Sequence, residues 1–286
     1  MDGYESDAEN EFVDGAPPAP VLRRRRFQRI PLRVLLPNLV TLLALALGLT
    51  AIRFAIEGRF ENSIYAIIAA AILDGLDGRI ARVLKGTSRF GAELDSLADF
   101  VDFGVAPALI LYLWSLHENR GFGWLAAMIF AIACALRLAR FNVSLDEPGR
   151  PAWQARYFVG MPAPAGACVV LLPLYLHYSV LGWPAAGEYI PLEIAFVLVI
   201  AFLMASRVPH YSGKSTDRVP REYFALLLFA VAFVVLMLAT YPMEMLAILT
   251  FIYLAVIPLS AYGYNRRATA GAVATKPGSG PPPPPP

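Results

Sequence analysis

Cysteine, histidine and charged residues are all scarce in this sequence. Its 286 residues include two cysteines and three histidines, and 16% of them are charged. Cys134 and Cys168 both lie within apolar stretches, so we expect them to pack as small hydrophobic side chains and not to form a disulfide. No histidine begins an H-x-K motif, which disfavours catalysis through a covalent histidine intermediate. The lack of a histidine and cysteine cluster also argues against structural zinc.

Apolar residues, in contrast, are abundant. They make up 57% of the chain, and the mean hydropathy is +0.55, which is typical of a membrane protein and not of a soluble domain. Stretches of near-spanning length occur at 34–52, 63–84, 92–116, 122–143, 160–181, 190–206, 222–240 and 245–264. The sequence therefore predicts an all-α, polytopic integral membrane bundle of about eight transmembrane helices.

The distribution of positive charge predicts an orientation for this bundle. When alternate connections are assigned to opposite sides, one side receives most of the arginines and lysines, beginning with the run from Arg23 to Arg29. The other side receives only Arg53, Arg59 and Arg120. Because positive residues favour the cytoplasm, we expect both termini to be cytoplasmic and the protein to lie in the cell's inner membrane. The basic run gives no sign of a nucleic-acid-binding fold, so no nucleic-acid partner is expected.

Four segments are predicted along the chain. Residues 1–32 and the proline-rich residues 267–286 have the composition of disordered tails, the first of them cytoplasmic. Between them, residues 33–206 would form the core of about six transmembrane helices, and residues 207–266 would add two more. Any catalytic site is expected in the core, because the ionisable residues inside apolar stretches occur there.

Those ionisable residues belong to the pattern D-x2-D-G-x2-A-R-x8-G-x3-D-x3-D. The residues that it specifies are Asp74, Asp77, Gly78, Ala81, Arg82, Gly91, Asp95 and Asp99. On helices turning about 100° per residue, the first five lie within an arc of about 140°. The other three lie with Asp102 within about 80° on the next helix. Because carboxylates inside a membrane are costly, two facing polar stripes of this kind predict a functional site.

Clustered carboxylates need positive charge nearby. An all-oxygen ligand set suits Mg²⁺ or Mn²⁺, and we expect two ions, which could clamp a pyrophosphate. The alternative is a structural network in which the acids pair with Arg79 and Arg82. Four acids against two arginines would leave excess negative charge, which favours the metal site.

The same pattern resembles the signature of the CDP-alcohol phosphotransferase family. The resemblance implies metal binding by Asp74, Asp77, Asp95 and Asp99, with Asp99 also acting as the general base. It further implies CDP binding by Gly78, Arg82 and Gly91, beside Asp77 and Ala81, and it suggests a homodimer. Asn38 follows Pro37 at the start of the first apolar stretch, where it could bind a phosphate or cap the helix.

Segments outside the signature resemble the branch of that family that makes phosphatidylserine. They are PNLVTLLALALGLTA at 37–51, SLADFVDFGVAPA at 96–108, RLARFN at 137–142 and VGMPAPAGA at 159–167. The resemblance implies transfer of a phosphatidyl group from CDP-diacylglycerol to the hydroxyl of L-serine, with release of CMP. Choline, glycerol 3-phosphate and inositol phosphate remain alternative acceptors, and an ion-coupled transporter is the alternative from another class.

The acceptor would need its own binding residues. Arg137, Arg140 and Asn142 lie near the predicted cytoplasmic end of the fourth stretch, where arginine could bind a carboxylate in a bidentate manner. They could also be anchors at the membrane surface. Asp102 continues the Asp95 and Asp99 stripe, so it could meet the serine ammonium group or support another side chain.

Overall fold

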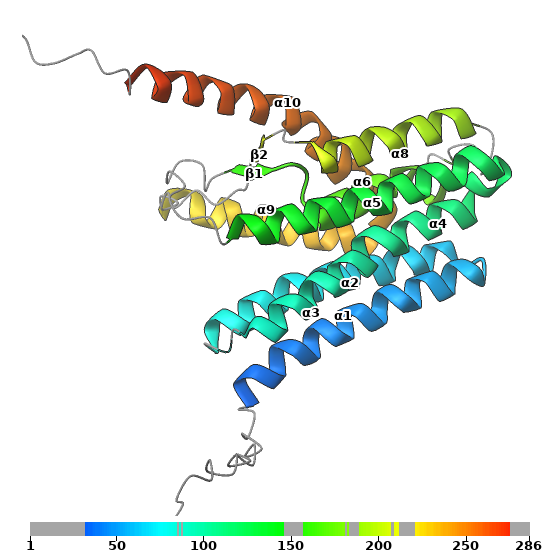
Figure 1. The fold of residues 1–286 in the computed structure, drawn as a ribbon, viewed down its shortest axis with the longest axis horizontal. Coiled ribbons are helices and arrows are strands. Elements are labelled where there is room, and N and C mark those ends of the chain that lie inside the picture. The colour runs from blue at the N-terminus through cyan, green and yellow to red at the C-terminus, as the bar shows by residue number, and fades with distance from the viewer. Residues whose placement is uncertain are drawn as a thin grey trace, which may run out of the picture. The chain divides into compact units, whose positions relative to one another are not determined.

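Helices make up most of what the computed structural model describes, which is residues 32–84, 86, 88–145, 157–180, 182, 189–206, 209–211 and 221–274 (Figure 1). The helices are α1 (Leu32–Ile56), α2 (Phe60–Val83), α3 (Arg89–Phe100), α4 (Ala106–Trp114), α5 (Arg120–Leu145), α6 (Ala163–Val170), α7 (Leu172–Tyr178), α8 (Ile190–Ala205), α9 (Arg221–Thr240) and α10 (Pro242–Ala274). A π-helical turn, η1 (Val101–Val105), joins α3 to α4, and a 3₁₀ turn, η2 (Leu116–Glu118), follows α4. The expected all-α membrane fold is confirmed.

The helix count of eight is not confirmed. Five helical segments of the described chain are long and apolar enough to cross a membrane, namely 35–56, 89–114, 120–144, 222–240 and 242–260. Helix α2 carries Asp74, Asp77 and Arg82 of the signature, and α8 has only 16 residues. The protein is therefore a multi-pass membrane protein in which some helices are too short or too polar to meet the criteria for a membrane span.

The stretch at 160–181 does not form the single spanning helix that we predicted. It begins beside β1 (Tyr157–Val159), which pairs antiparallel with β2 (Pro209–Tyr211), and it then forms two short helices that break at Leu171. Pro173, in the first turn of α7, has no N–H to donate to the preceding turn, which explains the break. Hydropathy alone does not reveal this break, because Leu171 and Pro173 lie within one apolar stretch of the sequence.

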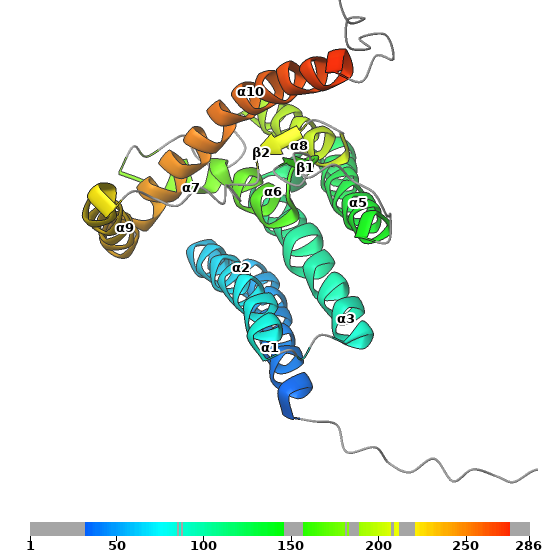
Figure 2. The same ribbon diagram turned by 90° about the vertical axis from the view of Figure 1, so that its left-hand side faces the viewer.

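Helices α1 and α2 form an antiparallel hairpin and lie side by side in both views (Figures 1 and 2). The turn between them contains Gly58 with a φ of 73°, a left-handed conformation that glycine adopts without strain. The buried Ser63 hydroxyl donates to the Ala51 carbonyl at 2.9 Å and so joins the two helices near the turn. The hairpin places the start of α1 beside the end of α2, where the signature lies.

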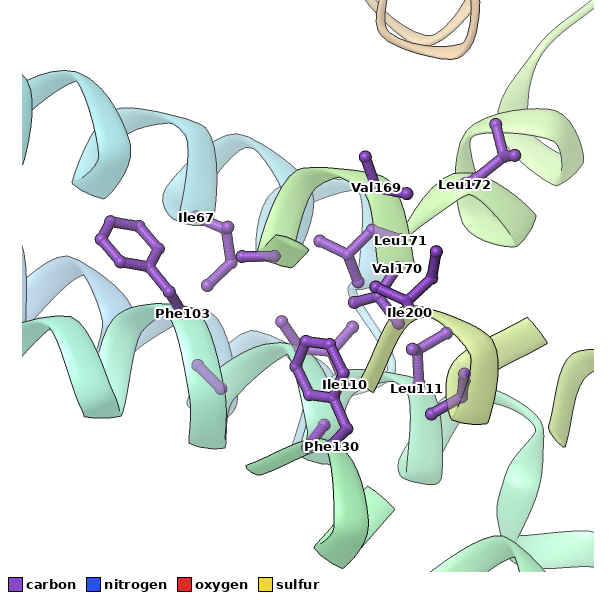
Figure 3. Close-up of a cluster of buried hydrophobic side chains, with 14 of the residues drawn as sticks. Ile67, Phe103, Ile110, Leu111, Phe130, Val169, Val170, Leu171, Leu172 and Ile200 are labelled. Carbon is purple, nitrogen blue, oxygen red and sulfur yellow. The ribbon is translucent and has the colours of Figure 1, made fainter. Parts of the chain in front are cut away.

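The apolar core lies between these helices and the later ones. Figure 3 shows Ile67 of α2, Phe103 of η1, Phe130 of α5, Val170 of α6 and Ile200 of α8 directed into one cluster. All five side chains are essentially inaccessible to solvent. Because helices from both halves of the chain contribute, this core holds the signature helices against the second half.

Two features bear on the predicted segments. Nearly every described side chain of α9 is exposed, which suits a helix surrounded by lipid. Helix α10 continues to Ala274, beyond the boundary at 266 that we expected, because the alanine-rich sequence there favours helix. The rest of the two predicted tails, residues 1–31 and 275–286, lies outside the described residues, as does the basic run from Arg23 to Arg29.

Candidate active site

A pocket lies where the start of α1, the end of α2 and the start of α3 meet. Its lining consists of Pro37, Asn38, Thr41, Asp77, Gly78, Ala81, Arg82, Gly86, Ser88, Gly91, Ala92 and Asp95. All six residues that the sequence suggested for CDP binding are among them. The structure therefore brings this part of the predicted site together at one place.

Two glycines shape the walls of this pocket. A Cβ added to Gly91 would come within 2.7 Å of Asn38 Oδ1, so the lack of a side chain lets α3 approach α1 closely. Ser88 caps α3 by accepting a hydrogen bond from the Gly91 N–H at 3.0 Å. A Cβ at Gly78 would instead point into open space, so a larger side chain there would enter the pocket.

Beside the pocket, three carboxylates converge from two helices. Asp74 of α2 and Asp95 and Asp99 of α3 each offer an oxygen, and these oxygens all lie within 4.8 Å of one another. The three side chains are half-buried. Converging carboxylate oxygens are the ligands that hard divalent cations prefer, so this donor set fits the predicted metal site.

The fourth carboxylate of the signature is held differently. Asp77 is 4% exposed, and its Oδ2 accepts a hydrogen bond from Thr41 Oγ1 at 2.6 Å. Thr41 lies on α1 and is itself buried. Sequence reasoning missed this residue, although its spacing of three from Asn38 within the PNLVT segment places both on one face of α1.

Arg79 and Arg82 do not pair with these acids. Within the described ranges, the only ion pairs closer than 4.0 Å join Glu57 to Arg53 and Arg59, at the opposite end of the α1–α2 hairpin. Arg79 and Arg82 are exposed, and Arg82 Nε donates to the Gly78 carbonyl at 3.0 Å. The alternative of a structural network with these two arginines is therefore not supported.

Arg137 of α5 is a buried basic residue whose charge interacts with the carboxylates. It is 9% exposed, and its guanidinium interacts electrostatically with Asp99 and Asp74. The guanidinium also lies 5.6 Å from the centre of the Phe141 ring. One buried cation beside three carboxylates leaves the cluster with excess negative charge, which further favours a bound metal ion.

The other residues expected to bind the acceptor have different contacts. Arg140 Nη2 donates to the Met204 carbonyl at 3.2 Å, near the end of α8, where helix carbonyls lack partners within the helix. Asn142 Nδ2 donates to Ser96 Oγ at 2.8 Å and joins α5 to α3. Asn142 therefore contacts an acid-bearing helix and Arg140 contacts α8, and neither hydrogen bond involves the three carboxylates.

Asp102 lies in η1 and is buried against α1. It is 1% exposed, and its Oδ1 has no hydrogen-bond partner. A Cβ added to Gly48 would overlap that oxygen, so Gly48 is the residue that lets α1 accommodate this carboxylate. Buried carboxylates without partners are rare and costly, which marks Asp102 as a candidate for binding a cationic group.

Both cysteines are free, as expected. Cys134 is buried and Cys168 is partly buried. Neither one lines the pocket.

Comparison with known proteins gives a family and several similar proteins. Residues 34–205 match the family model described as CDP-alcohol phosphatidyltransferase. The chain is similar to proteins named CDP-diacylglycerol–serine O-phosphatidyltransferase from Mycobacterium leprae and Helicobacter pylori. The first is 43% identical, over 84% of this chain and 78% of its own, and the second is 36% identical, over 68% and 79%. A protein of the same name from Bacillus subtilis is 31% identical, over 64% of this chain and 94% of its own.

Proposed function

Because the chain belongs to the CDP-alcohol phosphatidyltransferase family, we propose that it transfers the phosphatidyl group of CDP-diacylglycerol to the hydroxyl of L-serine. The products are phosphatidylserine and CMP. The observation that carries this proposal is the pocket lined by Asp77, Gly78, Arg82 and Gly91 directly beside the cluster of Asp74, Asp95 and Asp99. Serine is the acceptor named for relatives that match most of this chain.

The pocket would hold the CDP group of the donor. Gly78 leaves open space for the phosphates to approach the backbone, and Arg82 offers a planar cation for their oxygens. Asn38 and Ala81 also line the pocket, the first with an amide that can bond to the nucleotide. Arg82 currently donates only Nε to a carbonyl, which leaves its terminal nitrogens for phosphate.

The carboxylates would hold the divalent cations that this family generally uses. Asp74, Asp95 and Asp99 would share the ligand positions with Asp77, and we propose two ions of Mg²⁺ or Mn²⁺. When bound, such ions would neutralise the pyrophosphate and the departing CMP. Asp99 would accept the proton of the serine hydroxyl. The serine oxygen would then attack the lipid-bearing phosphorus as the bond between that phosphorus and CMP breaks.

The acceptor would be bound from α5 and η1. Arg137 would bind the serine carboxylate, since it is a buried cation whose charge interacts with the Asp99 carboxylate. Asp102 would bind the serine ammonium group, because its Oδ1 has no hydrogen-bond partner and the ammonium group can donate to it. Arg140 and Asn142 would shape this side of the site through their contacts with α8 and α3.

We further propose that the site faces the cytoplasm of the inner membrane, with both chain ends on the same side. The positive charges of the sequence support this orientation. The turn between α1 and α2 and the turn between α4 and α5 lie at one end of the bundle in Figure 1, opposite the pocket. We propose residues 33–206 as the catalytic core, residues 207–266 as an added two-helix segment, and a homodimer as the assembly.

An acceptor panel tests the function. Purified protein in detergent would receive CDP-diacylglycerol, Mg²⁺ or Mn²⁺, and one of serine, choline, glycerol 3-phosphate or inositol phosphate. We expect CMP release and a lipid product with serine only. Release with another acceptor would replace the substrate, whereas no release with any acceptor would contradict the transferase activity and leave a transporter to be tested.

A further inference from the structure

Helix α1 contacts the site through one face. Asn38, Thr41 and Gly48 lie within about 80° on this helix, and each one meets a different part of the signature helices. Asn38 lies against Gly91, and Gly48 lies against Asp102. Thr41 differs from both because it makes a direct hydrogen bond to a signature carboxylate. Helix α1 therefore also contributes a side chain that binds a signature carboxylate.

The bond between Thr41 and Asp77 has a defined direction. The Thr41 hydroxyl has a single proton and two acceptors in reach, Asp77 Oδ2 at 2.6 Å and the Pro37 carbonyl at 3.1 Å. The shorter contact is to the ionisable group, and hydrogen bonds to a carboxylate are the stronger ones. The hydroxyl therefore donates to Oδ2 of Asp77.

Burial makes this bond consequential. Thr41 is 5% exposed and Asp77 is 4% exposed, so water has little access to replace a missing donor. Asp77 is also the signature carboxylate that lies outside the group of three converging oxygens. Thr41 holds it from another helix, whereas the other three acids adjoin one another.

We propose that Thr41 is a positioning residue that fixes the carboxylate of Asp77 for divalent-metal binding. This inference rests on the proposed function, since it assumes that Asp77 is one of the metal ligands. Groups that orient metal ligands typically contribute about 10- to 100-fold to metal affinity or activity. Removing the Thr41 hydroxyl should therefore weaken metal binding without removing any ligand.

Direct Mn²⁺ binding provides the test. Purified protein without substrate would be titrated with Mn²⁺, and the loss of the free-ion signal would be followed by electron paramagnetic resonance. Thr41→Val retains the branched shape and loses the hydroxyl, so its apparent Kd should rise about 10- to 100-fold. Thr41→Ser retains the hydroxyl and should restore binding close to that of the unchanged protein.

Thr50 offers a matched control. It lies on the same helix, its hydroxyl donates to the Ala46 carbonyl, and it is not part of the pocket. Thr50→Val should leave the Mn²⁺ affinity unchanged. In activity assays, Thr41→Val should raise the metal concentration needed for half-maximal turnover, while the KM for CDP-diacylglycerol at saturating metal should change little.

The outcomes separate this inference from the proposed function. Failure of the unchanged protein to bind Mn²⁺ would reject the metal centre itself. Normal binding by both the unchanged protein and Thr41→Val would reject only the role of Thr41, as would a rise in the KM for CDP-diacylglycerol with unaltered Mn²⁺ affinity. If Thr41→Val does not fold, Thr41→Ala removes the same hydroxyl and should show the same loss.

Discussion

The two halves of the site differ in how they are built. The half proposed for CDP consists of six predicted residues that all line one pocket between α1, α2 and α3. The half proposed for serine consists of four predicted residues whose side chains have four different surroundings. The first half is a surface already assembled, whereas the second contains one buried cation, one buried carboxylate and two contacts between helices.

This difference predicts which substitutions affect turnover and which also affect stability. Residues of the first half all line the pocket, although Asp77 accepts a hydrogen bond from Thr41 and Arg82 donates one to the Gly78 carbonyl. Arg140 and Asn142 in the second half already donate to protein acceptors, so part of their contribution is structural. Substitutions should therefore affect turnover in the first half and a mixture of turnover and stability in the second.

The largest expected effect is on the metal cluster. Asp95→Asn removes one charge from three converging carboxylates and should lower turnover at least about a thousandfold, equivalent to about 4 kcal/mol. Release of CMP gives the measurement. Glu93→Gln is the matched control, because Glu93 is an exposed acid on the same helix, and it should retain activity. Comparable activity in the two variants would contradict the metal cluster.

Arg137 and Arg140 provide the sharpest comparison within the acceptor half. Arg137→Lys loses the bidentate guanidinium, which should cost about 1.5–3 kcal/mol and raise the serine KM about 10- to 100-fold. The KM for CDP-diacylglycerol should change much less. Arg140→Lys should leave the serine KM nearly unchanged, since its guanidinium contacts the end of α8. An equal rise in both variants would place both arginines in the serine pocket.

Substitution of Gly48 tests whether α1 must pack closely against Asp102. A valine there would overlap the Asp102 carboxylate, so Gly48→Val should lower the free energy of unfolding by about 1–3 kcal/mol. Thermal unfolding in detergent measures this loss. Gly121→Ala is the control, because a Cβ at Gly121 meets nothing within 4 Å. Unchanged stability of Gly48→Val would mean that α1 can shift away from η1.

Asn142 should give the smallest effect. Its bond to Ser96 is partly buried and neutral, so Asn142→Ala should cost about 0.5–1.5 kcal/mol of stability. The serine KM should change little, because the amide already has a protein partner. Kinetics over a range of serine concentrations check this point, and a rise of tenfold or more would move Asn142 into direct contact with the acceptor.

The sequence predicted the fold class, and the residues that it suggested for CDP binding line one pocket, because both features depend largely on local spacing. Apolar runs long enough to span a membrane predict helices wherever a proline or a polar stripe does not intervene. The residues of the signature lie on two adjacent helices joined by a short connection, so helical periodicity alone places them face to face. The pattern therefore contained most of the geometry of this half.

The sequence by itself determined an apolar helical bundle, the residues of the signature and the chemistry that clustered carboxylates require. Only the tertiary structure decided that Leu171 ends a helix, that Thr41 donates to Asp77, and that Arg137 is near Asp99 while Arg140 is not directed there. These contacts join helices that are distant in sequence. Which atoms meet across them depends on helix rotation, close approach at glycines and side-chain length, and periodicity along one helix does not encode those quantities.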